Sequence, residues 1–110
     1  MSPGQRFDMN KLLQQAQQMQ EQMQQAQEAL ANETVEASAG GGTVTVKARG
    51  TGEIVEVKIA PDAIDPDDPA MLEDLVLAAT NEALRAAQSL MESRLGPIAG
   101  GLGGLGLPGL

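Results

Sequence analysis

The sequence contains no cysteine and no histidine. These absences exclude disulfides, thiol catalysis, metal sites of the Cys/His type and acid–base catalysis by histidine. Tryptophan and tyrosine are also missing, and Phe7 is the only aromatic residue, so aromatic stacking on single-stranded nucleic-acid bases is nearly excluded. No apolar run approaches the ~20 residues of a membrane span, and the N-terminus lacks an apolar signal-peptide core. We therefore expect a soluble, cytoplasmic protein that does not enter a membrane.

Bases are also scarce, but the negative charge is unevenly distributed. The 110 residues carry 15 acidic and 7 basic side chains, which gives a formal net charge of -8. Residues 61–74 contain six acids and no base, and the rest of the chain is close to neutral. A local basic patch is therefore compatible with the negative total. The segment Asp65-Pro-Asp-Asp-Pro69 lacks the ligand spacing and the glycine of a calcium-binding EF-hand loop, so we interpret these acids as turn and capping residues.

A heptad stripe in the glutamine-rich segment predicts a helix over residues 9–31, with Asp8 as its N-cap. Apolar residues recur in steps of three and four at Met9, Leu12, Ala16, Met19, Met23, Ala26 and Leu30. A stripe this narrow does not stabilise an isolated helix in water. The stripe therefore indicates that the helix packs on a second surface.

Three short segments of alternating polarity follow and predict an antiparallel meander. They span residues 33–38, 43–49 and 53–59, and are separated by Gly40-Gly-Gly42 and Gly50-Thr-Gly52. The first glycine run is not followed by the lysine and helix of a phosphate-binding loop, so a hairpin turn is the better interpretation. In the last segment we expect Val55, Val57 and Ile59 to face the core and Ile54 to face outward.

A second helix is predicted from Asp68, a suitable N-cap, to about Leu95, where Gly96-Pro97 stops it. One face of this helix is apolar enough to cover the sheet. A second apolar line at Leu77, Leu84 and Met91 repeats every seven residues beside that face. A helix that is apolar over so much of its surface has two neighbours, which we expect to be the sheet and either the first helix or a partner chain.

The predicted fold class is therefore α+β, in the order α-β-β-β-α, with a three-stranded antiparallel meander between two long helices. We expect a flexible N-terminus at residues 1–8, one domain at 9–95, and a disordered, glycine-rich tail at 96–110. The core is thin, and small domains gain stability from oligomerisation, so a homodimer with twofold symmetry is expected. The predicted dimer interface consists of Leu12, Ala16, Met19, Met23, Leu77, Leu84 and Met91.

A set of short motifs resembles the YbaB/EbfC family of nucleoid-associated DNA-binding proteins, over about residues 9–110. They are Met9-Asn-Lys-Leu12, Gly40-Gly-Gly-Thr-Val-Thr-Val46, Gly50-Thr-Gly-Glu-Ile-Val-Glu-Val-Lys-Ile59, Asp65-Pro-Asp-Asp68, Leu72-Glu-Asp-Leu75, Ala78-Ala-Thr-Asn-Glu-Ala-Leu84 and the ending Gly-Leu-Pro-Gly-Leu110. Their order and spacing are specific, although each motif alone is weak. The resemblance implies a small bacterial dimer, shaped like tweezers, that coats or bridges duplex DNA in the nucleoid.

Six of the seven bases are candidate DNA contacts. They are Arg6, Lys11, Lys47, Arg49, Arg85 and Arg94. The alternative for each is a solvated charge or a local ion pair, and we interpret Lys58 in this second way because Glu56 is beside it on the predicted sheet. With so few aromatics, we expect salt-sensitive contacts to the backbone and shape of DNA rather than readout of bases.

We predict a protein that is not an enzyme, because the carboxylates cluster in a capping segment and no nucleophile–base pair is apparent. No metal, cofactor or small-molecule substrate is expected. The predicted function is to bind double-stranded DNA as a homodimer, to organise or bridge it with assembly into higher multimers, and to modulate expression. The alternative is an acidic adaptor that recruits a protein partner through the heptad stripe and the C-terminal tail, with weak or no DNA binding.

Overall fold

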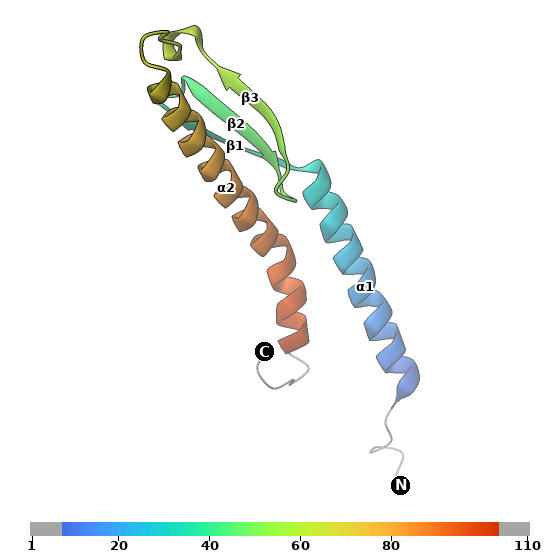
Figure 1. Ribbon diagram of the computed structural model, residues 1–110. Coiled ribbons are helices and arrows are strands. Elements are labelled where there is room, and N and C mark those ends of the chain that lie inside the picture. Colours follow the sequence, from blue (N-terminus) through green and yellow to red (C-terminus); the bar gives the residue numbers. More distant parts are fainter. Residues whose placement is uncertain (1–7, 104–110) are drawn as a thin grey trace.

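The computed structural model describes residues 8–103 and contains a helix, three strands and a long helix in the predicted order (Figure 1). The elements are α1 (Met9–Asn32), β1 (Thr34–Ala39), β2 (Val44–Arg49), β3 (Ile54–Ile59), the 3-10 helix η2 (Pro61–Ala63) and α2 (Pro69–Gly103). The strands form one antiparallel sheet in the order β1-β2-β3. The α-β-β-β-α order and the meander are thus confirmed.

The ends of the elements follow local chemistry that the sequence already contains. The Asp8 carboxylate accepts a hydrogen bond from the Lys11 backbone N–H at 3.1 Å, and Asp68 caps α2 in the same way through the Met71 N–H at 3.2 Å. The turn between β1 and β2 has φ angles of 62, 68 and 91° at Gly40, Gly41 and Gly42. Only glycine adopts such angles without strain, so this run is a hairpin turn, as predicted.

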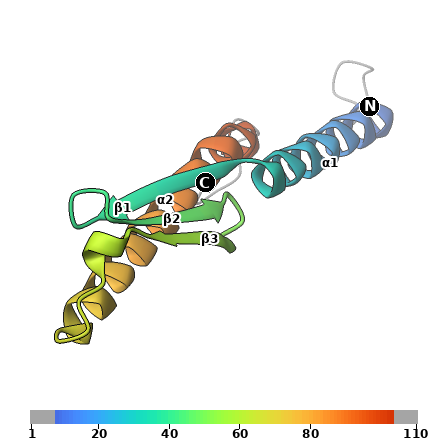
Figure 2. The same ribbon diagram turned by 90° about the horizontal axis from the view of Figure 1, so that it is seen from above.

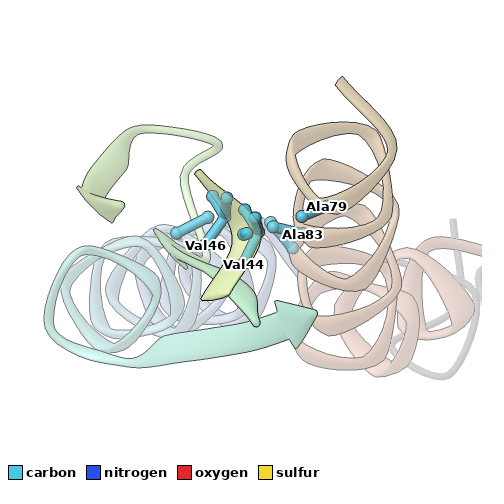
Figure 3. Close-up of a cluster of buried hydrophobic side chains, with 7 residues drawn as sticks. Val44, Val46, Ala79 and Ala83 are labelled. Carbon is cyan, nitrogen blue, oxygen red and sulfur yellow. The ribbon is translucent and has the colours of Figure 1, made fainter. Parts of the chain in front are cut away.

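The core is one layer of side chains between α2 and the sheet. Val44 and Val46 of β2 are fully buried against the equally buried Ala79 and Ala83 of α2 (Figure 3). The alanines have no bulk beyond Cβ, so the helix backbone lies close to the strands. Because side chains alternate along a strand, Lys47 of β2 lies on the opposite face of the sheet.

The first residues of β3 depart from the predicted alternation. Glu56 is opposite Lys47, whereas Ile54 is opposite Ala48, so Val55 is the extra residue of a β-bulge. The bulge shifts the alternation by one position, and Ile54 packs against the core. The expectation that Ile54 faces outward and Val55 faces the core is therefore wrong.

The rest of β3 has the predicted orientation but little cover. Val57 and Ile59 are opposite Val46 and Val44, which places them on the core-facing side of the sheet. They nevertheless remain 46% and 38% exposed. The reason is that α2 packs over β1 and β2 and leaves β3 at the open edge.

The second helix extends beyond the predicted end at Leu95 and continues through Pro97 to Gly103. Ile98 is buried, and together with Pro97 it lines a shallow groove whose opposite wall contains Ala26 and Ala29 of α1. A proline inside a helix removes a backbone hydrogen bond, and the packing of this part of α2 on α1 offsets that cost in free energy. The pattern within one segment does not contain this packing, because it depends on another helix. The expected flexibility of residues 1–7 and 104–110 lies outside the described residues.

The first helix projects from the body of the molecule as an arm (Figures 1 and 2). Its side chains from Met9 to Gln18 are all exposed, and the part that contacts α2 is near its C-terminal end. The molecule is consequently long and thin, with extents of 81 × 25 × 16 Å. Among the described residues, no helix is both long and apolar enough to cross a membrane.

Candidate functional site

The most acidic segment of the molecule lies far from Lys11. The acids of residues 61–74 are in the connection after β3 and the beginning of α2, at the top of Figure 1. Lys11 is in the first turn of α1, at the opposite end of the long axis. A polyanion at the free end of α1 would therefore be separated from the most acidic segment by most of the length of the molecule.

Two acids of this connection serve a turn and a cap, as the sequence indicates. The Asp65 carboxylate accepts a hydrogen bond from the Asp67 backbone N–H at 2.9 Å, and Asp68 caps α2. Within residues 8–103, no group of three Asp, Glu, His or Cys side chains is placed to hold a metal ion.

Lys11 is a predicted DNA contact with an exposed side chain. Its side chain is exposed on the free end of α1, and no ion pair in the part of the chain that the structure describes involves it. Its ammonium is therefore available to a phosphate. Arg6, which the sequence places beside it, lies outside the described residues.

Lys47 and Lys58 share one carboxylate on the outer face of the sheet. Their Nζ atoms lie 3.5 and 3.6 Å from the two oxygens of Glu56. The interpretation of Lys58 as an ion-paired residue is confirmed. The same carboxylate partly neutralises Lys47, so this predicted DNA contact presents less free charge than the sequence suggests.

Arg85 and Arg49 also have partners within the chain. Arg85 Nη1 lies 2.6 Å from a Glu82 oxygen, one turn away on the outer side of α2. Arg49 Nη1 donates to the Ala31 carbonyl oxygen at 2.8 Å, and its Nε lies 3.4 Å from Glu53. Arg49 thus satisfies a carbonyl at the C-terminal end of α1, where backbone acceptors lack helical partners.

Among the ion pairs of the described residues, the pair of Arg94 with Glu33 joins the two residues that are farthest apart in the sequence. The Arg94 guanidinium, in the last third of α2, holds both carboxylate oxygens of Glu33, which lies between α1 and β1. The two residues are 61 positions apart. No local pattern contains this pair, so the sequence analysis did not find it when it named Arg94 as a candidate DNA contact.

The five predicted DNA contacts that the structure describes therefore do not form one patch. Lys11 is at the tip of α1, Lys47 is on the outer face of the sheet, and Arg85 is on the outer side of α2. Arg49 and Arg94 both bind groups at the corner where α1 meets β1. The structure thus separates the five described candidates into one free charge, two charges paired with neighbouring carboxylates, and two residues that hold the corner.

The predicted association residues lie on two separate helices. On α1, Ala16, Met19 and Met23 line a shallow groove together with glutamine side chains, and Leu12 is exposed nearer the tip. On α2, Leu77 and Leu84 are 60% and 37% exposed, because α1 reaches only the C-terminal end of that helix, and Met91 is half-buried. Val57 and Ile59 of β3 add a third uncovered apolar area that the sequence did not indicate.

The sequence matches the model of the YbaB/EbfC DNA-binding family over residues 5–102. It is 53% identical over 110 residues to a nucleoid-associated protein of Mycolicibacterium vanbaalenii, with complete coverage of both chains. It is 50% identical over 116 residues to a nucleoid-associated protein of Saccharopolyspora erythraea, again with complete coverage of both chains. A nucleoid-associated protein of Acetivibrio thermocellus is 53% identical over 108 residues, which are 98% of this chain and 94% of that relative.

A crystal structure of an uncharacterized protein from Helicobacter pylori has a similar fold, with a TM-score of 0.68 at 22% identity. The match covers 80% of this chain and 92% of that one. The names of the family and of the relatives are those of DNA-binding and nucleoid-associated proteins rather than enzymes, which confirms the prediction that this protein is not an enzyme.

Proposed function

This chain belongs to the YbaB/EbfC DNA-binding family, and from this premise we propose that it binds double-stranded DNA as a homodimer and organises or bridges it in the nucleoid. The observation that carries the proposal is the family match over residues 5–102, together with relatives named nucleoid-associated protein that align over their full length. In this role the protein is cytoplasmic, assembles into higher multimers along DNA, and modulates expression of the genes that it covers.

The separation of charge supports this function in spite of the net charge of -8. Lys11 is exposed at the tip of α1, and the acids of residues 61–74 lie at the other end of the molecule. Since charges in salt solution act over about 10 Å or less, the distant acids hardly weaken attraction between the tip and a phosphate. DNA therefore approaches the free end of α1.

The uncovered apolar residues support a homodimer. Residues of α1, α2 and β3 are exposed in a single chain, and a second copy related by twofold symmetry would cover them. We assign this interface to Leu12, Ala16, Met19, Met23, Leu77, Leu84 and Met91, as the sequence predicts, and extend it to Val57 and Ile59.

A dimer also resolves the shortage of bases. A single chain offers few free cations, but a dimer doubles each of them, and several weak contacts on one DNA molecule sum to a useful affinity. Contacts of this kind read phosphate position and groove shape rather than base edges. We place Lys11 and Arg6 first among the contacts, with Lys47 and Arg85 contributing through their exposed charges.

We test the function by fluorescence anisotropy of a labelled duplex across a series of salt concentrations. The affinity is expected to fall steeply with salt. The logarithm of the association constant, plotted against the logarithm of the salt concentration, should have a slope of about -0.9 for each neutralised phosphate. Lys11→Ala should weaken binding and reduce the magnitude of this slope by about 1 for each phosphate that Lys11 neutralises. The measured quantities are the dissociation constant and its salt dependence.

Lys58→Ala is the matched control, because it removes the same charge from a lysine that is already paired with Glu56 on the sheet. It should leave the slope unchanged. Equal effects of the two substitutions would contradict a specific role for the tip of α1. Absence of binding even at low salt would refute DNA binding and favour the adaptor function, in which the α1 stripe and the tail recruit a protein.

A further inference from the structure

The corner between α1 and β1 decides where the first helix points. α1 ends at Asn32 and β1 begins at Thr34, so the connection consists of Glu33 alone, with φ -89° and ψ 142°. A connection of one residue leaves no loop to absorb a change in direction. Within one chain, the orientation of α1 therefore depends on the contacts made at this corner and just beside it.

Backbone groups and a buried leucine hold the corner from the sheet side. The Glu33 N–H donates to the Ala29 carbonyl at 2.8 Å, and the Glu33 carbonyl accepts from the Gly50 N–H at 3.0 Å. Leu30 is buried and packs against Gly50. A Cβ atom added at Gly50 would lie 2.7 Å from the Leu30 side chain. The Arg49 guanidinium binds the Ala31 carbonyl at 2.8 Å.

Arg94 holds the same corner from the other side. Its Nε lies 3.3 Å from Glu33 Oε2, and its Nη2 binds Oε1, so the guanidinium grips the carboxylate through two nitrogens. Such a two-point contact fixes orientation as well as distance, which a single ammonium contact does not. The pair thus links the α1–β1 corner to α2, whose C-terminal part also packs beside α1.

Small changes at this corner have large effects at the tip. The 24 residues of α1 form a helix about 36 Å long, so a rotation of ~10° at the corner moves its first turn by ~6 Å. Lys11 is in that first turn, and its neighbours along the arm are exposed. A displacement of ~6 Å exceeds the rise of ~3.4 Å between successive phosphates of one strand of duplex DNA, so it changes which phosphate Lys11 can reach.

We propose that Glu33 and Arg94 are positioning residues for DNA binding, and that they act by fixing the direction of α1 rather than by touching DNA. The proposal rests on the function proposed above. It assigns Arg94 to an intramolecular clamp, together with Arg49, instead of to a phosphate contact. Removal of the clamp leaves the folded body intact and spreads α1 over a wider range of directions.

The first test measures the direction of α1 without DNA. The chain has no cysteine, so Gln14→Cys on α1 and Ser89→Cys on α2 give two unique, exposed attachment points for spin labels. Labelled protein is diluted with excess unlabelled chain so that only distances within one protomer are recorded by pulsed electron paramagnetic resonance. Glu33→Ala should broaden or shift the distance distribution by several ångströms.

The exchange of the two charges provides the decisive control for this test. Glu33→Arg combined with Arg94→Glu restores an ion pair in the opposite sense, and it should return the distribution towards that of the original chain. An unchanged distance distribution in Glu33→Ala would overturn the positioning role. So would a distance distribution of the double variant that is no narrower than those of Glu33→Arg and Arg94→Glu measured separately.

The second test uses the sign of the effect on DNA affinity. Glu33→Ala removes a negative charge, so simple electrostatics predicts tighter binding, whereas loss of positioning predicts weaker binding. We expect the affinity to fall by about three- to tenfold, because apparent affinity scales with the fraction of molecules in the competent conformation. The salt slope should stay the same, since the same phosphates are neutralised in the bound state.

Glu28→Ala is the matched control, because Glu28 is an exposed acid near the same corner that makes no ion pair within residues 8–103. It should leave the affinity unchanged or slightly raised. If Glu33→Ala binds as tightly as Glu28→Ala, or if Arg94→Ala lowers the salt slope as removal of a phosphate-binding residue would, the proposal is overturned. If the original chain binds no DNA, the proposed function fails, and the distance measurement still decides whether the clamp directs α1.

Discussion

At the residue scale, Gly50 lies in close contact with the end of α1. A Cβ atom at this position would lie 2.7 Å from the Leu30 Cδ2 atom and 3.0 Å from the Leu30 carbonyl oxygen. The side chain of Leu30 could rotate away, but the backbone oxygen could do so only if α1 moved. The glycine is thus required by contact between elements rather than by an unusual backbone angle.

Gly50→Ala is therefore expected to lower the free energy of unfolding by about 1–3 kcal/mol, as overpacking of a buried contact does. Urea denaturation followed by circular dichroism measures the change. Ser89→Ala is the control, since Ser89 is exposed on α2 and alanine favours a helix more than serine, so this substitution should be neutral or stabilising by less than ~1 kcal/mol. Equal losses at the two positions would show that the corner is not tightly packed.

At the element scale, α1 and β3 each present an apolar surface that their own chain leaves open. The α1 surface is the heptad stripe with Ala16, Met19 and Met23 along a shallow groove. The β3 surface is the pair Val57 and Ile59, which their own chain leaves partly uncovered. The two surfaces lie on different elements, so substitutions in α1 and in β3 test their contributions to association separately.

Met23→Lys and Ala16→Lys should weaken self-association at least tenfold, because a buried, unpaired charge costs more than the contact that it replaces. Sedimentation velocity across a concentration series measures the monomer–dimer equilibrium. Gln14→Lys adds the same charge on the opposite side of α1 and should leave the equilibrium unchanged.

The same measurement on Val57→Lys assigns the β3 surface. A loss of dimer in this variant, with the α1 variants unaffected, would place the interface on the sheet alone. A folded original chain that remains monomeric at all concentrations would contradict the homodimer itself.

At the scale of the whole molecule, length separates charges that the composition only counts. The molecule is 81 Å long, and the screening length at physiological salt is about 8 Å. The acids near the start of α2 and the base at the tip of α1 therefore act independently in solution. The net charge alone would predict repulsion of DNA, whereas this arrangement permits attraction at one end.

The double substitution Glu73→Gln with Asp74→Asn removes two negative charges from the acidic end. It is nevertheless expected to change DNA affinity by less than about twofold at physiological salt. Both side chains are exposed near the beginning of α2. The anisotropy titration used for Lys11→Ala measures the effect. A large gain in affinity would mean that DNA passes close to the acidic end, in conflict with binding at the tip of α1.

Local patterns in the sequence are sufficient to predict the elements and their order. Caps at Asp8 and Asp68, the glycine turn at residues 40–42, and the alternation that buries Val44 and Val46 are local chemistry, and all are present in the structure. Such features depend on residues a few positions apart, so a pattern within one segment contains the information that they need.

The contacts between elements, in contrast, depend on the tertiary fold. The bulge that turns Ile54 inward requires the register with β2, and the extension of α2 past Pro97 requires the packing of Ile98 beside α1. The pair of Glu33 with Arg94 joins residues 61 positions apart. These contacts arise only when segments distant in the chain meet, so the sequence identified the basic residues but could not separate the free lysine at the tip from the arginines that hold the corner.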